Sequence, residues 1–152
     1  MKKTANLEDI KKLRAETSAG VSDVTKALEE ASNDLNKARE LLKKRGVEIA
    51  EKKKERQTFE GTIDSYIHSN GKVGVLLSLL CETDFVARTD DFKSLAHEIS
   101  MQIAAMEPSN VETLLKQAYI RDNSITIEQL IKQTIGKLGE NIKVKEFTRF
   151  EL

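Results

Sequence analysis

The sequence predicts an α+β protein, with an N-terminal three-helix bundle followed by a small core of a three-stranded antiparallel sheet packed with helices. Three observations support this prediction. Apolar residues recur at helical spacing over residues 6–46. An apolar run from Val73 to Cys81 follows an Asn-Gly pair, which is typical of a hairpin turn. Helical patterns then lead to a last strand, giving the order strand, strand, three helices, strand.

The first two helices are bounded by residues that favour helix ends. Asn6 can cap the first helix with its side chain, and the stretch from Thr17 to Gly20 ends it. Ser22 or Asp23 is predicted to cap the second helix. The apolar residues expected to face inward from these two helices are Leu7, Ile10, Leu13, Val24, Ala27, Leu28 and Ala31.

The third helix is predicted to begin after Asp34 and to end at Gly46. Basic residues precede this glycine, and both features suit a helix C-terminus. Three helices in about forty residues would form a compact bundle similar to a ubiquitin-associated domain, and its small core predicts marginal stability. The residues expected to face inward are Leu35, Ala38, Leu41 and Leu42.

These patterns divide the chain into a module at 1–46, a charged linker at 47–57 and an α+β core at 58–152. The linker carries Lys52-Lys53-Lys54-Glu55-Arg56. We interpret it as a solvated, partly helical segment, because the run is short and contains acidic residues. The alternative is a basic contact for RNA or an acidic partner.

The core is predicted to begin with a hairpin over residues 58–82. Its turn contains Asn70-Gly71, so that His68 lies opposite Val73. The return strand, Val73 to Cys81, has apolar residues on both faces, which predicts a central strand covered on both sides.

Three helices and a last strand follow the hairpin. Asp90 is expected to cap a long helix that Pro108 stops, and its inward residues are Phe92, Leu95, Ala96, Ile99, Ile103 and Met106. The next predicted elements are a helix at Val111–Ala118, a turn at 122–124 and a helix at Thr126–Leu138 ended by Gly139, with Leu130, Ile131 and Ile135 inward. The last strand is Ile142–Leu152, in which Phe147 breaks the alternation and indicates a bulge.

Composition excludes several classes of function. The 152-residue chain has a formal net charge of zero and no Trp, which argues against nucleic-acid binding by bulk positive charge or by base stacking. The longest apolar run is too short to cross a membrane, and Met1–Thr4 leads into a polar helix rather than a signal core. A single cysteine fits a reducing compartment, so we expect a cytoplasmic protein with no membrane and no direct nucleic-acid partner.

No catalytic apparatus is evident in the sequence. A Cys81–His68 pair is the obvious nucleophile and base, but the hairpin separates these residues by roughly 26 Å along the strand. Neither a metal-ligand spacing nor a phosphate-binding glycine loop is present. We therefore expect a non-enzymatic protein without a cofactor or a bound metal.

The segment from Thr83 to Arg88 is the most informative part of the chain. Thr83 and Asp84 can both accept hydrogen bonds from backbone N–H groups and so start a helical turn at the end of the strand. Phe85 then lies at the rim of the domain. It either folds back into the core or is offered to a partner, because burying a Phe is worth roughly 1.5–3 kcal/mol.

Three stretches resemble the elongation factor Ts family. Cys81-Glu82-Thr83-Asp84-Phe85-Val86-Ala87-Arg88 resembles the signature of that family. The stretch from Leu13 to Leu28 is similar to its Leu-Arg-x-x-Thr-Gly-Ala-Gly-Met-x-Asp-x-x-x-Ala-Leu pattern. Gly139-Glu140-Asn141-Ile142 with Arg149-Phe150-Glu151-Leu152 matches its last strand.

The resemblance implies a guanine-nucleotide exchange factor that binds elongation factor Tu and lowers its hold on GDP. In the family the Thr-Asp-Phe-Val segment, here Thr83, Asp84, Phe85 and Val86, enters near the partner's magnesium and displaces it. Arg14, Val21 and Ser22 match family positions that face the nucleotide-binding domain. The alternative is an adaptor whose ubiquitin-associated-like helices bind another protein without promoting exchange.

The chain departs from the family pattern in three places. Ser18 replaces a usual Gly, Val21 replaces a usual Met, and the region between Met106 and Asn123 is much shorter than is typical. In the family, short members supply the second half of the core from another subunit, and exposed sheet edges add support for a homodimer. Thr148 offers no thiol for a cross-link, so we expect a non-covalent dimer unless Cys81 is exposed.

Overall fold

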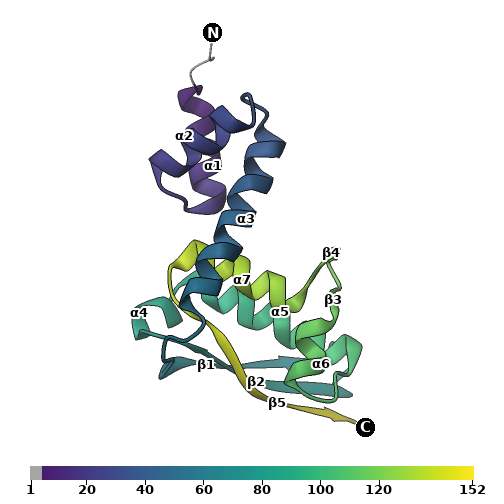
Figure 1. Cartoon of the computed structure of the whole chain (residues 1–152). Helices are drawn as coiled ribbons and strands as arrows, with labels where there is room; N and C mark the ends of the chain where they lie inside the picture. Colours follow the sequence, from purple (N-terminus) through teal and green to yellow (C-terminus); the bar gives the residue numbers. More distant parts are fainter. Residues whose placement is uncertain (1–4) are drawn as a thin grey trace.

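A computed structural model describes residues 5–152 as a helix bundle joined to an α+β core by one long helix (Figure 1). The bundle contains α1 (Leu7–Thr17), α2 (Val21–Glu30) and the first half of α3 (Leu35–Lys53). The predicted 1–46 module therefore begins before the described residues, and the whole Met1–Thr4 segment lies outside them. The α+β class is confirmed, with a three-stranded antiparallel sheet in the core.

The bundle closes around a small aliphatic core that largely follows the predicted pattern. Its fully or nearly buried side chains are Leu13, Val24, Ala27, Leu28, Ala31, Ala38 and Leu42. Leu7 is 62% exposed, so its predicted inward position is wrong. The predicted cap of α2 is also wrong, because Gly20 is the N-cap and makes no side-chain hydrogen bond.

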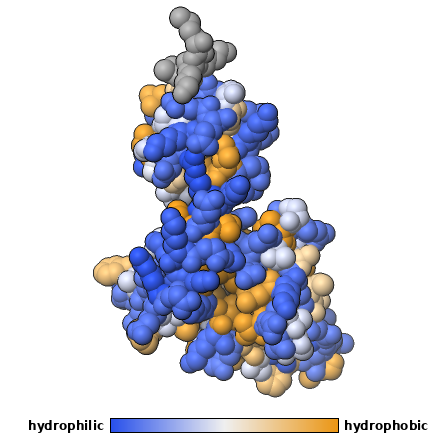
Figure 2. All heavy atoms as spheres, viewed as in Figure 1, coloured by the Kyte–Doolittle hydropathy of each residue, from blue (hydrophilic) through white to orange (hydrophobic). Residues whose placement is uncertain are grey.

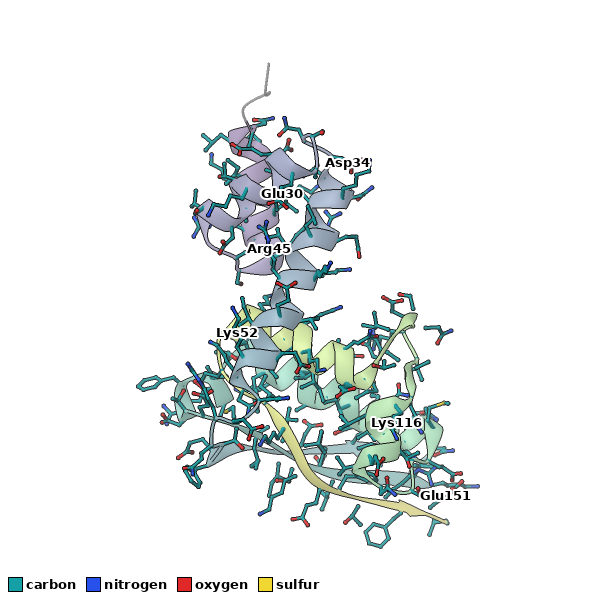
Figure 3. The ribbon with its side chains drawn as sticks, in the orientation of Figure 1. Glu30, Asp34, Arg45, Lys52, Lys116 and Glu151 are labelled. Atoms are coloured by element: carbon teal, nitrogen blue, oxygen red, sulfur yellow. The ribbon has the colours of Figure 1, made fainter. Side chains whose placement is uncertain are left out.

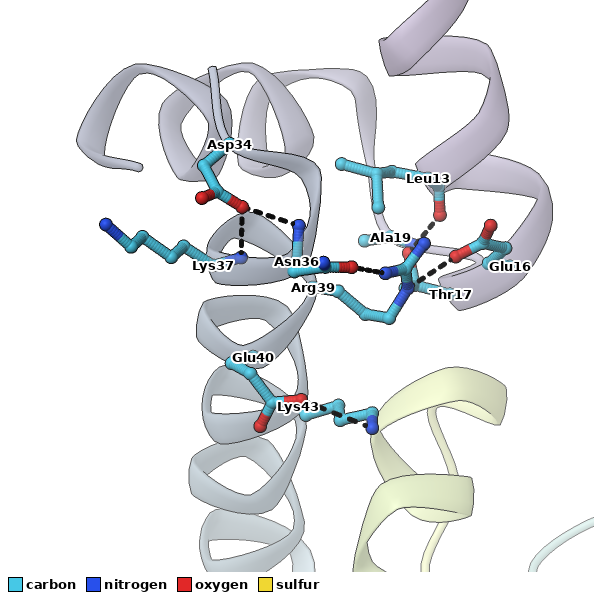
Figure 4. Close-up of polar contacts among 10 residues, drawn as sticks. All are labelled: Leu13, Glu16, Thr17, Ala19, Asp34, Asn36, Lys37, Arg39, Glu40 and Lys43. Carbon is cyan, nitrogen blue, oxygen red and sulfur yellow. Dashed lines mark hydrogen bonds and ion pairs between the residues drawn. The ribbon is translucent and has the colours of Figure 1, made fainter. Parts of the chain in front are cut away.

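Polar side chains hold the three helices of the bundle together. The Arg39 Nε atom of α3 lies 2.7 Å from Glu16 Oε2 at the end of α1 (Figure 4). Asp34 caps α3 by accepting hydrogen bonds from the backbone N–H groups of Asn36 and Lys37. Arg45 and Glu30 lie side by side on α3 and α2 (Figure 3), with an Nη2–Oε1 distance of 2.7 Å.

Helix α3 does not end at Gly46, contrary to the prediction, but continues to Lys53. Seven residues of the predicted 47–57 linker are therefore helical and belong to the element that enters the core. The glycine serves close packing instead of a helix end: a Cβ atom on Gly136 of α7 (Ile127–Leu138) would lie 2.8 Å from the Gly46 carbonyl oxygen.

The sheet has the order β1-β2-β5, with β2 in the centre as predicted. Its strands are β1 (Glu60–Ile67), β2 (Val73–Cys81) and β5 (Lys143–Glu151). His68 donates its backbone N–H to the Val73 carbonyl, which confirms the predicted pairing across the turn. The register of β2 with β5 shifts between Ser78 and Leu79, so the bulge lies at Lys145, two residues before the predicted position.

Helices pack on one face of this sheet. They are α4 (Asp84–Ala87), α5 (Asp90–Met106), α6 (Val111–Lys116) and α7. A small hairpin of β3 (Ala118–Tyr119) and β4 (Asp122–Thr126) replaces the predicted turn at 122–124. The cap of α5 is Thr89 rather than Asp90, and Met106 is 49% exposed rather than inward.

The two faces of the sheet differ sharply in burial. On the inner face, Val75, Leu77, Leu79 and Cys81 are buried together with the apolar side of α5. The outer face carries Ile63, Ile67, Leu76, Leu80 and Phe150, as the strand register shows. Leu76 is 52% exposed, so the prediction that β2 is covered on both sides is wrong for a single chain.

Candidate partner-binding site

The segment Thr83–Val86 lies where β2 leaves the sheet. Cys81, the last residue of β2, and Ala87, the last residue of α4, are both buried in the core. The residues between them form a single helical turn that projects from the rim of the domain (Figure 1). Because both ends of the turn are buried, its position is determined by the core.

Thr83 is the N-cap of this turn, as its sequence predicts. Its hydroxyl accepts a hydrogen bond from the Val86 N–H at 3.4 Å. Its own hydroxyl and N–H both donate to the carboxylate of Glu140, and the N–H bond measures 3.0 Å. Glu140 follows the end of α7, so a second chain segment 57 residues away holds the start of the turn.

A second carboxylate makes the reverse connection. Glu82 precedes Thr83, and its Oε1 atom accepts the backbone N–H of Asn141 at 2.8 Å. Asn141 is 2% exposed, and its amide donates to the carbonyl oxygens of Lys54 and Arg56. The corner after β2, the corner before β5 and the end of α3 are therefore joined by one hydrogen-bond network. Charge-assisted bonds of this kind are among the stronger ones in proteins.

Phe85 points away from the core and is 77% exposed. Its neighbours explain why it stays outside: Val86 packs against the core, whereas Asp84 pairs with Arg88 across one helical turn, Oδ2 to Nη2, at 3.0 Å. Of the two sequence interpretations, a Phe folded into the core is therefore wrong for the free chain. An exposed aromatic ring on a well-held turn is a feature of protein-binding surfaces.

The thiol of Cys81 is unsuited to nucleophilic chemistry in this position. Burial raises its pKa to about 11, and the nearby Glu140 carboxylate adds to the shift. His68 lies at the other end of β2, opposite Val73, as the hairpin predicted. Within residues 5–152, no group of three or more His, Cys, Asp or Glu side chains is arranged to hold a metal ion.

The second predicted patch lies on the bundle. Arg14 is exposed near the end of α1, and Val21 and Ser22 are exposed at the start of α2, with Val21 50% accessible. Between them, Ser18 adopts a left-handed backbone with φ of 55° and ends α1. Glycine adopts this conformation more readily, so the departure at Ser18 leaves the turn in place at some cost in strain.

The structure does not bring the two patches together. The bundle lies at one end of α3 and α4 lies beside the core at its other end (Figure 1). A single partner would therefore have to span both parts to contact Arg14, Val21 and Ser22 together with Phe85.

Sequence reasoning missed the residues that hold the turn. Glu140 and Asn141 belong to a stretch singled out for its family resemblance, but nothing local to it indicated a contact with Thr83 or Glu82. The available signal was the joint occurrence of two separated motifs, Glu82-Thr83 and Glu140-Asn141, which the fold places against each other.

The fold and its surfaces define a helix bundle joined to an α+β core, in which exposed apolar side chains are displayed on an ordered framework. A sequence profile of the family described as Elongation factor TS matches residues 82–152. Similar proteins include Elongation factor Ts of Thermotoga neapolitana, 41% identical over 97% of this chain and 96% of the relative. Elongation factor Ts of Coprothermobacter proteolyticus is 42% identical, over 94% of this chain and 95% of the relative. The chain belongs to the elongation factor Ts family.

This chain is shorter than the relatives it matches. The alignment with Elongation factor Ts of Rippkaea orientalis is 41% identical over 191 positions and covers 77% of that relative, whereas this chain has only 152 residues. The relatives therefore carry residues that this chain lacks. Across the part of the chain that the structure describes, every helix is too short or too polar to cross a membrane.

Proposed function

We propose that this chain is a guanine-nucleotide exchange factor that binds GDP-bound elongation factor Tu, promotes release of GDP and also binds the nucleotide-free form. Membership of the elongation factor Ts family supports this proposal. The observation that carries it is Phe85, exposed at the tip of a turn that Glu140 holds in place. In this proposal the chain acts by changing how tightly elongation factor Tu holds its nucleotide. It needs no catalytic residue, cofactor or metal of its own, and it works in the cytoplasm.

The exchange step is assigned to Thr83, Asp84, Phe85 and Val86. Phe85 is the group that enters the partner, because it is the large apolar side chain that the turn exposes. Its insertion near the partner's bound Mg²⁺ would displace the metal and weaken the binding of GDP. Thr83 and Asp84 position the turn, through the bond to Glu140 and the pair with Arg88.

The bundle contributes affinity through Arg14, Val21 and Ser22. All three are exposed, and they flank the turn between α1 and α2. A valine is shorter and stiffer than the methionine usual in the family, so this contact is expected to be weaker than in other members.

The second proposed partner is another copy of this chain, bound through the outer face of the sheet. Ile63, Ile67 and Phe150 are each more than 65% exposed there. Gly74 lies between Ile67 and Phe150 in the strand register, under an apolar groove of about 430 Å³. Two such faces packed together would form a sandwich and remove this apolar surface from water. The dimer is non-covalent, because Cys81 is fully buried.

The runner-up is an adaptor that binds a protein through its bundle and does not promote exchange. One experiment separates the two. Elongation factor Tu loaded with fluorescent GDP is mixed with excess unlabelled GDP, and the rate of fluorescence loss is recorded with and without this protein. We expect a large, saturable acceleration, and excess GDP should in turn weaken the complex, because such coupling is reciprocal. Binding without acceleration would establish the adaptor instead.

A further inference from the structure

Among residues 5–152, the one extensive contact between the bundle and the core is the crossing of α3 and α7. Within residues 5–152, helices α1 and α2 make no comparable contact with the core. Figure 2 shows a narrow neck at this point. Beside it lies an open cleft of about 620 Å³, lined by residues of the α1–α2 turn, α3 and α7. The orientation of the bundle therefore depends on one helix crossing.

Two glycines in helix interiors form this crossing. Gly46 of α3 and Gly136 of α7 face each other, and their backbones approach closely. Glycine disfavours helix, so two of them at one contact indicate a packing requirement. Ala50, one turn after Gly46, is 2% exposed and packs in the core beside Ile131 and Ile135, which extends the close contact.

Polar contacts fix the same crossing from both sides. Lys132 of α7 pairs with Glu51 of α3, and this contact lowers the pKa of Glu51 and raises that of Lys132. Lys53 donates to the carbonyl oxygen of Gly139 just after α7. On the bundle side, Arg45 bonds the Asp23 carbonyl of α2 at 3.0 Å as well as Glu30. Helix α2 is thus attached to α3 immediately before Gly46.

We propose that the Gly46–Gly136 crossing is a positioning contact, which sets the bundle so that its exposed patch and Phe85 engage one partner at the same time. The inference rests on the proposed function. The part of α3 from Leu35 to Gly46 is about 17 Å long at 1.5 Å per residue, so a tilt of about 5° at the crossing displaces its far end by about 1.5 Å. Two linked contacts bind a partner together only when the geometry allows both.

The two glycines provide a matched pair of substitutions. An added Cβ on Gly136 would lie 2.8 Å from the Gly46 carbonyl oxygen and 2.9 Å from its carbonyl carbon, inside the 3.5–4 Å of a normal contact. An added Cβ on Gly46 would lie 3.7 Å from the Gly136 Cα, which is an ordinary contact. Both changes to Ala favour the helix equally, so a difference between them reports the crossing itself.

The test measures stimulated GDP release from elongation factor Tu over a range of factor concentrations. For Gly136→Ala we expect the half-saturating concentration to rise about tenfold or more, while the rate at saturation stays near that of the unaltered protein because Phe85 is untouched. For Gly46→Ala we expect no change in either quantity. Because a smaller folded fraction would also raise the apparent half-saturating concentration, each titration uses the concentration of folded factor, measured by circular dichroism for that variant.

A double-mutant cycle provides the sharper readout. Val21→Ala should raise the half-saturating concentration in the unaltered protein and in Gly46→Ala, and should have little further effect in Gly136→Ala, where the patch is already misplaced. Spin labels on Glu29→Cys in α2 and Glu112→Cys in α6 report the geometry without the partner. Both sites are exposed, whereas Cys81 is fully buried and stays unlabelled. Gly136→Ala should shift or broaden the distance distribution, and Gly46→Ala should not.

If Gly136→Ala does not fold, the pair Glu51→Cys and Lys132→Cys, joined by a short bis-maleimide, locks the crossing in its observed state. Retention of the normal half-saturating concentration supports the proposal, and a large increase overturns it. Equal half-saturation in Gly136→Ala and Gly46→Ala, with GDP release still stimulated, overturns this proposal alone. No stimulation by the unaltered protein overturns the proposed function, and the positioning role with it.

Discussion

The two faces of the β1-β2-β5 sheet carry similar aliphatic side chains, but only one of them is buried in the chain. Leu79 on the inner face is fully buried, whereas Leu76 on the outer face is 52% exposed, although the two are three residues apart in one strand. Helix α5 covers the inner face. On the outer face, the side chains of Ile63, Ile67 and Phe150 are exposed to solvent.

This difference separates the residues that fold the chain from those available to bind a partner. Apolar patches of this kind on a protein surface usually mark interaction sites. Phe92 and Phe85 repeat the contrast in neighbouring helices, since Phe92 is fully buried in α5 while Phe85 is 77% exposed on α4. Substitution can therefore test folding and binding separately.

The largest effect is expected from Leu79→Ala. Truncating a fully buried leucine should lower the free energy of unfolding by about 2–5 kcal/mol, because it removes buried apolar surface and leaves a cavity. Leu76→Ala should change the stability of the monomer by less than about 0.5 kcal/mol. Urea denaturation at low protein concentration measures both. Equal losses would mean that the two faces do not differ as the structure shows.

The next effect concerns Phe85→Ala. The lost side chain is worth roughly 1.5–3 kcal/mol when buried in a partner, so stimulated GDP release should slow by about ten- to a hundredfold. The melting temperature should stay unchanged, because Phe85 is exposed in the free chain. Ile120→Ala, which truncates another exposed apolar residue, is the matched control and should alter neither measurement. If the Phe85→Ala protein is destabilised but its folded molecules still stimulate GDP release at the normal rate, Phe85 is not the group that enters the partner.

The smallest effect is expected on assembly. Light scattering at micromolar concentration should give about twice the chain mass of 17.1 kDa. Leu76→Asp places a charge on the outer face and should raise the dimer dissociation constant at least tenfold, about 1.4 kcal/mol. Ile120→Asp, at an exposed position outside that face, should remain dimeric. A monomeric unaltered protein would contradict the proposed dimer.

Much of the fold could be predicted because its signals are local. The bounds of β2, the pairing of His68 with Val73 and the end of α7 at Gly139 all follow from residues within one turn of each feature. The composition of the bundle core follows from helical spacing, apart from Leu7, whose place at the very start of α1 leaves it in water.

The errors have long-range causes. A glycine such as Gly46 can mark either the end of a helix or a close approach between two backbones. The residue that decides between them, Gly136, lies 90 residues further along the chain. The apolar pattern of β2 predicts that both faces are covered, but it does not say whether the same chain covers them. In the candidate site, Phe85 and Thr83 were visible in the sequence, whereas Glu140 acts on Thr83 only through the fold.

The bond between Thr83 and Glu140 also affects the entropy cost of binding a partner. A segment that is disordered before binding loses backbone freedom when it docks, roughly 1–2 kcal/mol for each residue that becomes ordered. Here the turn is already in place, with Cys81 and Ala87 buried at its ends. Its docking would therefore carry little ordering penalty, and burial of the Phe85 ring would appear in calorimetry as a negative heat-capacity change.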